Sequence, residues 1–185
     1  MGKIIPLVII TILAYSDLSQ ASTGTLTFKG ELAVNTCDVI VDDQAADATV
    51  VLPAVSVNQL TTAGQTAGDT VFVIGLRNCG GPLPFAYPTA AAFFEMGPSV
   101  DSVTGRLINI SGSASNVSLQ LRDRYSNALA VIQAGNQNQS GNIHHSMNNP
   151  SQGSLNLPYI VRYYAESQVT PGTVVSNVIY SIQYR

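Results

Sequence analysis

Few side chains of this sequence have the types and spacing that catalysis or metal binding needs. The only two histidines among the 185 residues are adjacent, at His144 and His145. Neighbouring side chains of an extended segment point to opposite sides, and no Asp, Glu or Cys stands at a metal-ligand spacing from either one. The surrounding segment is rich in Asn, Gln and Ser, which predicts a solvated loop and not a metal site.

Other reactive patterns are also missing from the sequence. There is no Gly-x-Ser-x-Gly nucleophile elbow and no Gly-rich phosphate motif. The acidic group Asp42, Asp43 and Asp47 lacks the spacing and closing glutamate of an EF-hand and favours a solvated hairpin. With 8 Lys+Arg against 11 Asp+Glu, no basic excess is present to hold nucleic acid. We therefore expect no enzyme, no cofactor, no metal and no nucleic-acid partner.

The first 21 residues have the pattern of a secretory signal peptide. Lys3 precedes an apolar run from Ile4 to Tyr15, and Ser19-Gln20-Ala21 supplies a small-x-small cleavage motif. The alternative is a membrane anchor, but the run is short for a spanning helix and contains Pro6. Export is therefore expected, with residues 1–21 removed.

Export determines how the two cysteines are interpreted. Cys37 and Cys79 are the only two in the sequence, and in an oxidising compartment such a pair predicts one disulfide. A metal site or a catalytic thiol is the alternative, and a metal site would need further ligands at short spacing.

The rest of the chain has the pattern of an all-β sandwich. Short alternating apolar segments are separated by clusters of Gly, Pro, Asn and Asp. Strands are expected at residues 26–34, 50–52, 71–76, 107–110, 117–122, 159–164 and 174–184, and loops at 59–69, 80–88 and 135–153. A short helical turn is the expectation for Ala90 to Met96. No boundary between folded domains is apparent after residue 31.

Both ends of the expected mature chain alternate with period two. Val178, Tyr180, Ile182 and Tyr184 share one face of the last strand, which ends at Arg185. In the first segment, Leu26 and Phe28 share a face with Gly24 and Gly30. An alternating strand at a free end can add itself to the sheet edge of another chain, although both could equally be ordinary members of one sheet.

The order of these pieces resembles the pilin subunits of chaperone–usher, type 1-like fimbriae of Gram-negative bacteria. The resemblance rests on the Gly24-x-Leu26-x-Phe28-x-Gly30 segment followed by Cys37, on Val51-Leu52-Pro53, on the strand that leads to Cys79, and on the ending with a penultimate Tyr184. Further matches are the Val-x-Leu-x-Leu strand at residues 117–121 and the segment from Tyr159 to Gly172.

The resemblance implies an immunoglobulin-like sandwich that lacks its final strand. A donor strand from a neighbouring subunit would complete it, replacing a strand of a periplasmic chaperone at an outer-membrane usher. Residues 22–30 would be the donor extension, with Leu26 and Phe28 as anchors, and residues 31–185 the pilin domain. The groove and chaperone-binding strand would be Val178, Tyr180, Ile182, Tyr184 and Arg185. The product would be an extracellular fimbrium, in which any host receptor is met only through the assembled fibre.

The short segment ahead of Leu26 leaves shaft and linker subunits as alternatives. From another class, a self-contained secreted module that binds a carbohydrate or a receptor would also be a β-sandwich. Such a module should be a stable monomer, whereas a pilin should need a donor strand.

Overall fold

The computed structural model describes residues 37–79, 89–125, 129–139, 142–146 and 153–185. The predicted signal peptide and the predicted donor residues Gly24, Leu26, Phe28 and Gly30 lie outside this part of the chain. Among the residues described, no helix is long and apolar enough to cross a membrane.

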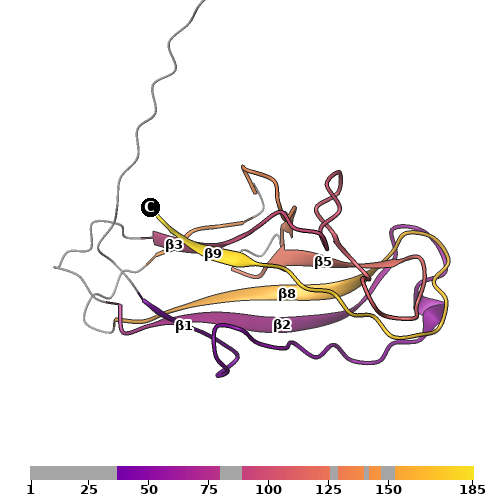
Figure 1. Ribbon diagram of the computed structural model, residues 1–185, viewed down its shortest axis with the longest axis horizontal. Helices are drawn as coiled ribbons and strands as arrows, with labels where there is room; N and C mark the ends of the chain where they lie inside the picture. The colour runs from indigo at the N-terminus through magenta and orange to yellow at the C-terminus, as the bar shows by residue number, and fades with distance from the viewer. Residues whose placement is uncertain (1–36, 80–88, 126–128, 140–141, 147–152) are drawn as a thin grey trace, which may run out of the picture. The chain divides into compact units, whose positions relative to one another are not determined.

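The described residues form two antiparallel sheets (Figure 1). The larger sheet has the order β1 (Asp38–Val41), β2 (Thr66–Arg77), β8 (Leu155–Ala165), β5 (Val117–Asp123) and β4 (Leu107–Ile108), and β6 (Val131–Ile132) also pairs with β5. The smaller sheet has the order β7 (His145–Ser146), β3 (Thr89–Phe94) and β9 (Tyr180–Tyr184). A single turn of 3-10 helix, η1 (Val57–Gln59), lies between β1 and β2.

The core forms where the inward faces of the two sheets meet. Alternate residues of β2, β5 and β8 are apolar and buried, as period-two alternation predicts. Together with β3 they contribute Phe72, Ile74, Leu76, Ala90, Ala92, Phe94, Leu119, Leu121, Leu157, Tyr159 and Val161. Burying a side chain of this size stabilises the fold by about 1.5–3 kcal/mol, so the all-β core is the main source of stability.

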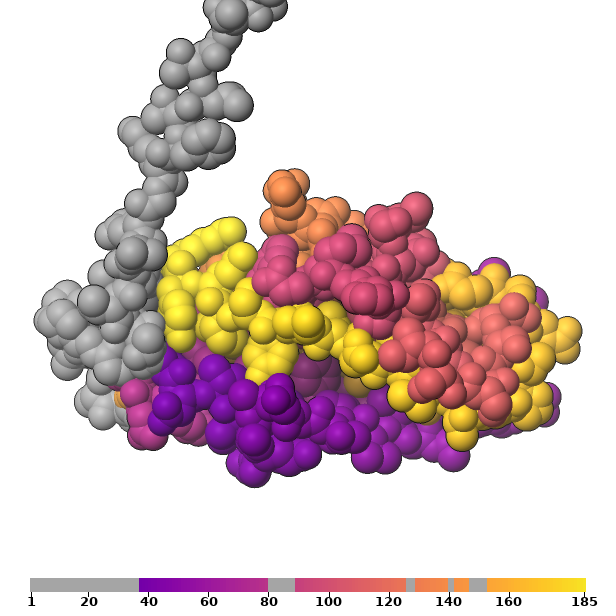
Figure 2. All heavy atoms as spheres, in the orientation of Figure 1, coloured from indigo at the N-terminus to yellow at the C-terminus, as the bar shows by residue number. Residues whose placement is uncertain are grey.

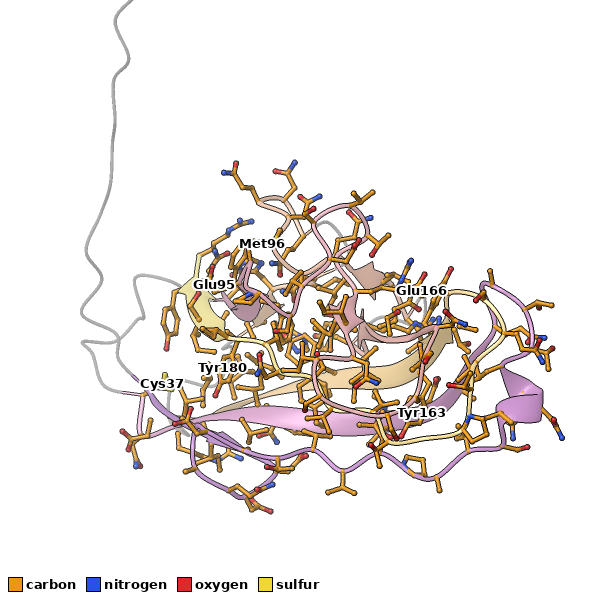
Figure 3. All side chains as sticks on the ribbon, turned by 45° about the vertical axis from the view of Figure 1, so that its right-hand side comes forward. Cys37, Glu95, Met96, Tyr163, Glu166 and Tyr180 are labelled. Carbon is orange, nitrogen blue, oxygen red and sulfur yellow. A yellow bond between two sulfur atoms is a disulfide. The ribbon has the colours of Figure 1, made fainter. Side chains whose placement is uncertain are left out.

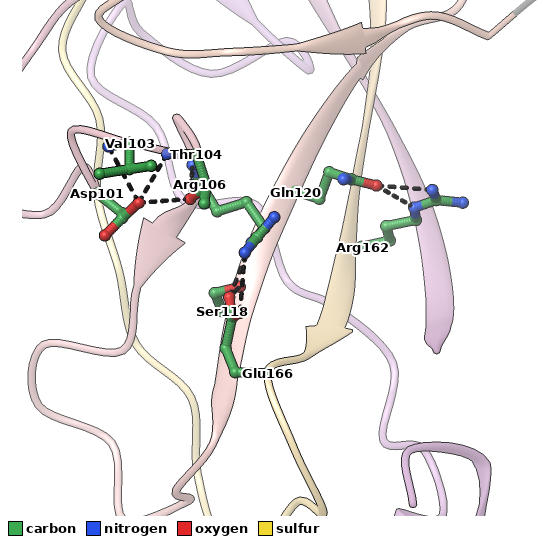
Figure 4. A network of polar contacts seen from close by, with 8 residues as sticks. All are labelled: Asp101, Val103, Thr104, Arg106, Ser118, Gln120, Arg162 and Glu166. Atoms are coloured by element: carbon green, nitrogen blue, oxygen red, sulfur yellow. Dashed lines mark hydrogen bonds and ion pairs between the residues drawn. The ribbon is translucent and has the colours of Figure 1, made fainter. Parts of the chain in front are cut away.

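A network of polar contacts lies on the outer face of the larger sheet, over β5 and β8 (Figure 4). Arg106 donates to Glu166 from both Nε and Nη2, at 2.7 and 2.8 Å, and Ser118 Oγ donates to the same carboxylate at 2.6 Å. Beside them Arg162 donates from Nε and Nη2 to Gln120 Oε1, at 3.0 and 2.6 Å. These polar groups satisfy one another on the outer face, and the larger sheet packs against the smaller one on its other side.

The structure corrects the expectation of a helical turn at Ala90 to Met96. Residues Thr89–Phe94 form β3, which pairs with β9 along its whole length, Ala90 with Tyr184 through Phe94 with Tyr180. The intrinsic helix preference of alanine is a few tenths of a kcal/mol per residue, and strand pairing with burial overrides it. The three alanines 90–92 are almost fully buried.

The predicted disulfide is present. Cys37 and Cys79 are bonded, with their Cα atoms 4.1 Å apart. The antiparallel register explains the proximity, because Asp38 at the start of β1 pairs with Arg77 at the end of β2. The bond therefore links the two outermost strands on that side of the larger sheet.

Candidate functional site: a groove beside the last strand

An apolar groove of about 560 Å³ runs between residues 41–52 and the segment leading into β9. Its floor consists of core side chains from the larger sheet and from Phe94 of β3, and Figure 2 shows the indigo and yellow segments on either side of the recess. The lining residues are Val41, Ala46, Asp47, Ala48, Thr49, Val50, Leu52, Phe72, Ile74, Phe94, Leu107, Leu119, Leu121, Val161, Val175, Ser176, Asn177, Val178 and Tyr180.

The last segment of the chain directs its even-numbered side chains inward. Val178, Tyr180, Ile182 and Tyr184 are half-buried and pack against the core, whereas Ile179 between them is 71% exposed. Strand geometry explains the alternation, since successive side chains of an extended segment point to opposite faces. The four residues predicted as the groove strand thus present one continuous apolar surface to the interior.

The backbone of this segment is paired along one edge only. Its odd-numbered residues accept backbone hydrogen bonds from other segments of the same subunit. Glu95 N–H donates to Ile179 O at 2.8 Å, and Ile110 N–H donates to Val175 O at 2.9 Å. Ala114 N–H donates to Thr173 O at 3.0 Å. Within the described residues, no backbone hydrogen bond involves Val174, Ser176 or Val178. The backbone groups of these even-numbered residues therefore form an open edge that faces the groove.

The opposite wall is open in the same way. Among the residues described, the backbone of Val50 to Leu52 makes no hydrogen bond. This explains why residues 50–52 and 174–179, predicted as strands, lie outside the observed strands. On the groove side, both segments lack a strand to pair with, because the space between them is the groove.

One side chain crosses between the two walls. Tyr180 Oη donates to the Ala46 carbonyl at 2.9 Å, and Figure 3 shows its side chain extending from β9. Burial, with a smaller contribution from the Asp47 carboxylate, raises the pKa of Tyr180. The phenol therefore keeps its proton at neutral pH and remains a donor to this carbonyl.

A polar group interrupts the apolar lining. The Ser176 hydroxyl is buried and has no hydrogen-bond partner within the described residues. A buried hydroxyl without a partner costs roughly 1–3 kcal/mol. This position of the groove therefore favours an occupant that can offer a hydrogen bond.

The structure assigns a role to Asn109 that the sequence did not reveal. Its Oδ1 accepts from Gly112 N–H at 2.9 Å and from Val175 N–H at 2.8 Å. Its Nδ2 donates to the carbonyls of Gly112, Ala114 and Thr173. Asn109 therefore fixes the start of the groove wall. No periodic or motif signal in the sequence marks this role, because the partners of the amide lie up to 66 residues away in the chain.

We expect Asn109→Ala to destabilise the groove wall. The substitution leaves several backbone groups without partners, and a reasonable estimate is a loss of about 1–3 kcal/mol in the free energy of unfolding. The N–H of Val175 should exchange with solvent faster, as hydrogen-exchange NMR or mass spectrometry would show. Asn138→Ala is a matched control in an exposed turn. Equal effects of the two substitutions would contradict the role of Asn109.

The structure also corrects the expectation that both histidines are solvated. His145 is 1% exposed, its ring lies 4.1 Å from that of Tyr125, and its Nε2 is 3.9 Å from Oδ2 of the buried Asp123. Burial alone would raise the pKa of Asp123, but nearby His145 and the N–H groups of Ile143 and Tyr125 outweigh it and lower the pKa. This pair holds the loop against β5, and neither residue lines the groove.

The fold and the groove together define a class of protein. Two packed antiparallel sheets with an open strand position beside the last strand form an immunoglobulin-like sandwich lacking one strand. A solved chaperone–usher pilus subunit has this fold, with a TM-score of 0.57 and 18% identity over 92% of this chain and all of that one.

Sequence comparison gives the family. The model of the FimA family, type-1 fimbrial protein, A, matches residues 52–185. Similar proteins include the major fimbrial subunit SMF-1 of Stenotrophomonas maltophilia, 38% identical over 90% of this chain and 95% of that one. Another is the F17 fimbrial protein of Escherichia coli, 33% identical over 93% of each chain. The chain belongs to the type-1 fimbrial protein family and is a structural subunit of extracellular fimbriae assembled through the periplasm.

Proposed function

We propose that the groove accepts an extended donor strand from a neighbouring copy of the subunit, and that polymerisation by this exchange is the function of the chain. The single observation that carries the proposal is the unpaired backbone of both groove walls over an apolar floor. Unpaired strand edges and exposed apolar surface both favour the addition of a strand.

Residues 22–30 are the proposed donor, ahead of a pilin domain at residues 31–185 and behind a signal peptide at residues 1–21. Nine extended residues span about 30 Å, and the wall from Val174 to Tyr184 has a similar length at about 3.3 Å per residue. Leu26 and Phe28 would enter the apolar floor, each contributing about 1.5–3 kcal/mol when buried. Gly24 would lie where the groove leaves no room for a side chain.

Before assembly the open groove needs protection. We propose that a periplasmic chaperone strand covers it along Val178, Tyr180, Ile182, Tyr184 and Arg185, and that an outer-membrane usher is where the donor replaces the chaperone. The role is then structural and not catalytic, as either a shaft or a linker subunit. A host receptor would be met only through the assembled fibre.

The test uses a chain trimmed to begin after Gly30, folded under oxidising conditions, with a synthetic peptide of residues 22–32. We expect the melting temperature to rise by many degrees when the peptide is added, because it supplies both the missing strand and its anchors. A peptide with aspartate at positions 26 and 28 is the matched control. A trimmed chain that is stable and indifferent to the peptide would instead indicate a complete, self-contained binding module.

A further inference from the structure

The smaller sheet has a second edge that could accept a strand. The odd-numbered residues of β3 pair with β9, as shown by the reciprocal hydrogen bonds between Thr89 and Arg185, each 2.9 Å long. The backbone groups of Ala90, Ala92 and Phe94 therefore point away from β9, toward the other side. On that side β7 is only two residues long, and its pairing with β3 covers Thr89 and Ala90.

Side chains, together with the Gly135 N–H that donates to Phe94 O at 2.8 Å, replace the missing part of that strand. Gln139 accepts from Phe94 N–H at 3.1 Å and donates from Nε2 to Phe94 O at 2.5 Å. Asn142 donates from Nδ2 to Ala92 O. The Tyr159 hydroxyl accepts from Ala92 N–H at 3.0 Å and lies 3.3 Å from Asn142 Oδ1.

The geometry imitates strand pairing. A side-chain amide carries both a donor and an acceptor, so Gln139 meets the N–H and the C=O of one residue just as an antiparallel strand would. The contact is well shielded, since Gln139 is 3% exposed and Phe94 is 1% exposed. The side chains of Gln139 and Asn142 are called the amide cap below.

We infer that the amide cap closes the free edge of β3, so that, among the residues that the structure describes, the groove beside β9 is the one edge of the smaller sheet left open to a strand. This inference rests on the proposed function, in which growth occurs through the groove. A second open edge would let a subunit capture a strand at a wrong position, and proteins commonly cover such edges to prevent aggregation. The cap thus favours a linear polymer.

The first test measures hydrogen exchange at individual amides of the full-length mature chain. Gln139→Ala should make the Phe94 N–H exchange about tenfold faster or more, because its acceptor is gone. The N–H groups of Ala91 and Phe93, which face β9, should keep their protection. Asn138→Ala is the matched control, since Asn138 lies in the same loop and is exposed. Unchanged exchange at Phe94, or the same increase in the control, would overturn the inference.

The second test asks whether the exposed edge associates. A full-length mature chain carrying Leu26→Asp and Phe28→Asp has no working donor, and a peptide of residues 22–32 in excess fills its groove. By sedimentation this complex should remain monomeric, whereas adding Gln139→Ala and Asn142→Ala should produce concentration-dependent oligomers. A double variant that stays monomeric would contradict edge closure. If the double variant does not fold, Gln139→Ala alone supplies the same comparison.

The two tests separate this inference from the proposed function. If the peptide fails to stabilise the chain, donor exchange is wrong, yet the exchange rate at Phe94 still reports on the cap. In the opposite outcome, the peptide binds but the variant without the amide cap shows neither faster exchange at the Phe94 N–H nor association. Donor exchange then stands, and the amide cap is only structural.

Discussion

Fibre formation should stop when Leu26 or Phe28 is replaced by aspartate. Either substitution would place a carboxylate in the apolar groove, where no cation lines the floor among the described residues. Burying an unpaired charge costs several kcal/mol, well beyond the 1.5–3 kcal/mol lost with the apolar side chain. We therefore expect the loss of polymers in electron micrographs and in heat-resistant ladders on gels.

A matched control comes from the same segment. Thr27 lies between the two anchors and, by strand alternation, faces the opposite side. Thr27→Asp should leave polymerisation largely intact. All three variants should still bind the chaperone, because the proposed chaperone contact is with the groove strand and not with residues 22–30. Normal fibres from the Leu26 or Phe28 variants would exclude these residues as donor anchors.

Removal of the disulfide should have the largest effect on stability. The bond between Cys37 and Cys79 closes a loop with a sequence separation of 42 residues. For a loop of that length the chain-entropy treatment gives about 4 kcal/mol. The double variant Cys37→Ala/Cys79→Ala should therefore lose a large part of its free energy of unfolding, since small domains have only about 5–15 kcal/mol in total.

Urea denaturation of the peptide-bound subunit would measure this loss, with the oxidised parent chain as reference. The same variant should bind the donor peptide more weakly, because β1 ends at Val41, which lines the groove. A loss below about 1 kcal/mol would mean that the unfolded chain is already restrained between residues 37 and 79.

The sequence alone determined the all-β class, the disulfide and the fimbrial family. The first two follow from period-two alternation and a lone cysteine pair, whereas the family came from the resemblance of the ordered motifs to known pilins. The sequence also predicted which side chains of the last strand point inward: Val178, Tyr180, Ile182 and Tyr184. This is possible because alternate residues of a strand lie on opposite faces. The same periodicity could not show that residues 50–52 and 174–179 have no strand paired with them on the groove side, since pairing depends on which segments lie beside them.

Only the tertiary structure decided which polar side chains hold the groove and the edges. Asn109 bonds to Val175, 66 residues away, and Gln139 bonds to Phe94, 45 residues away. A loop rich in Asn, Gln and Ser predicts solvent exposure, yet Gln139 and His145 are buried in it. Amide side chains have no periodic signature, and their partners are set by the folding of distant strands. Patterns of apolar residues therefore define the sandwich, while its polar contacts become visible only once the strands are in place.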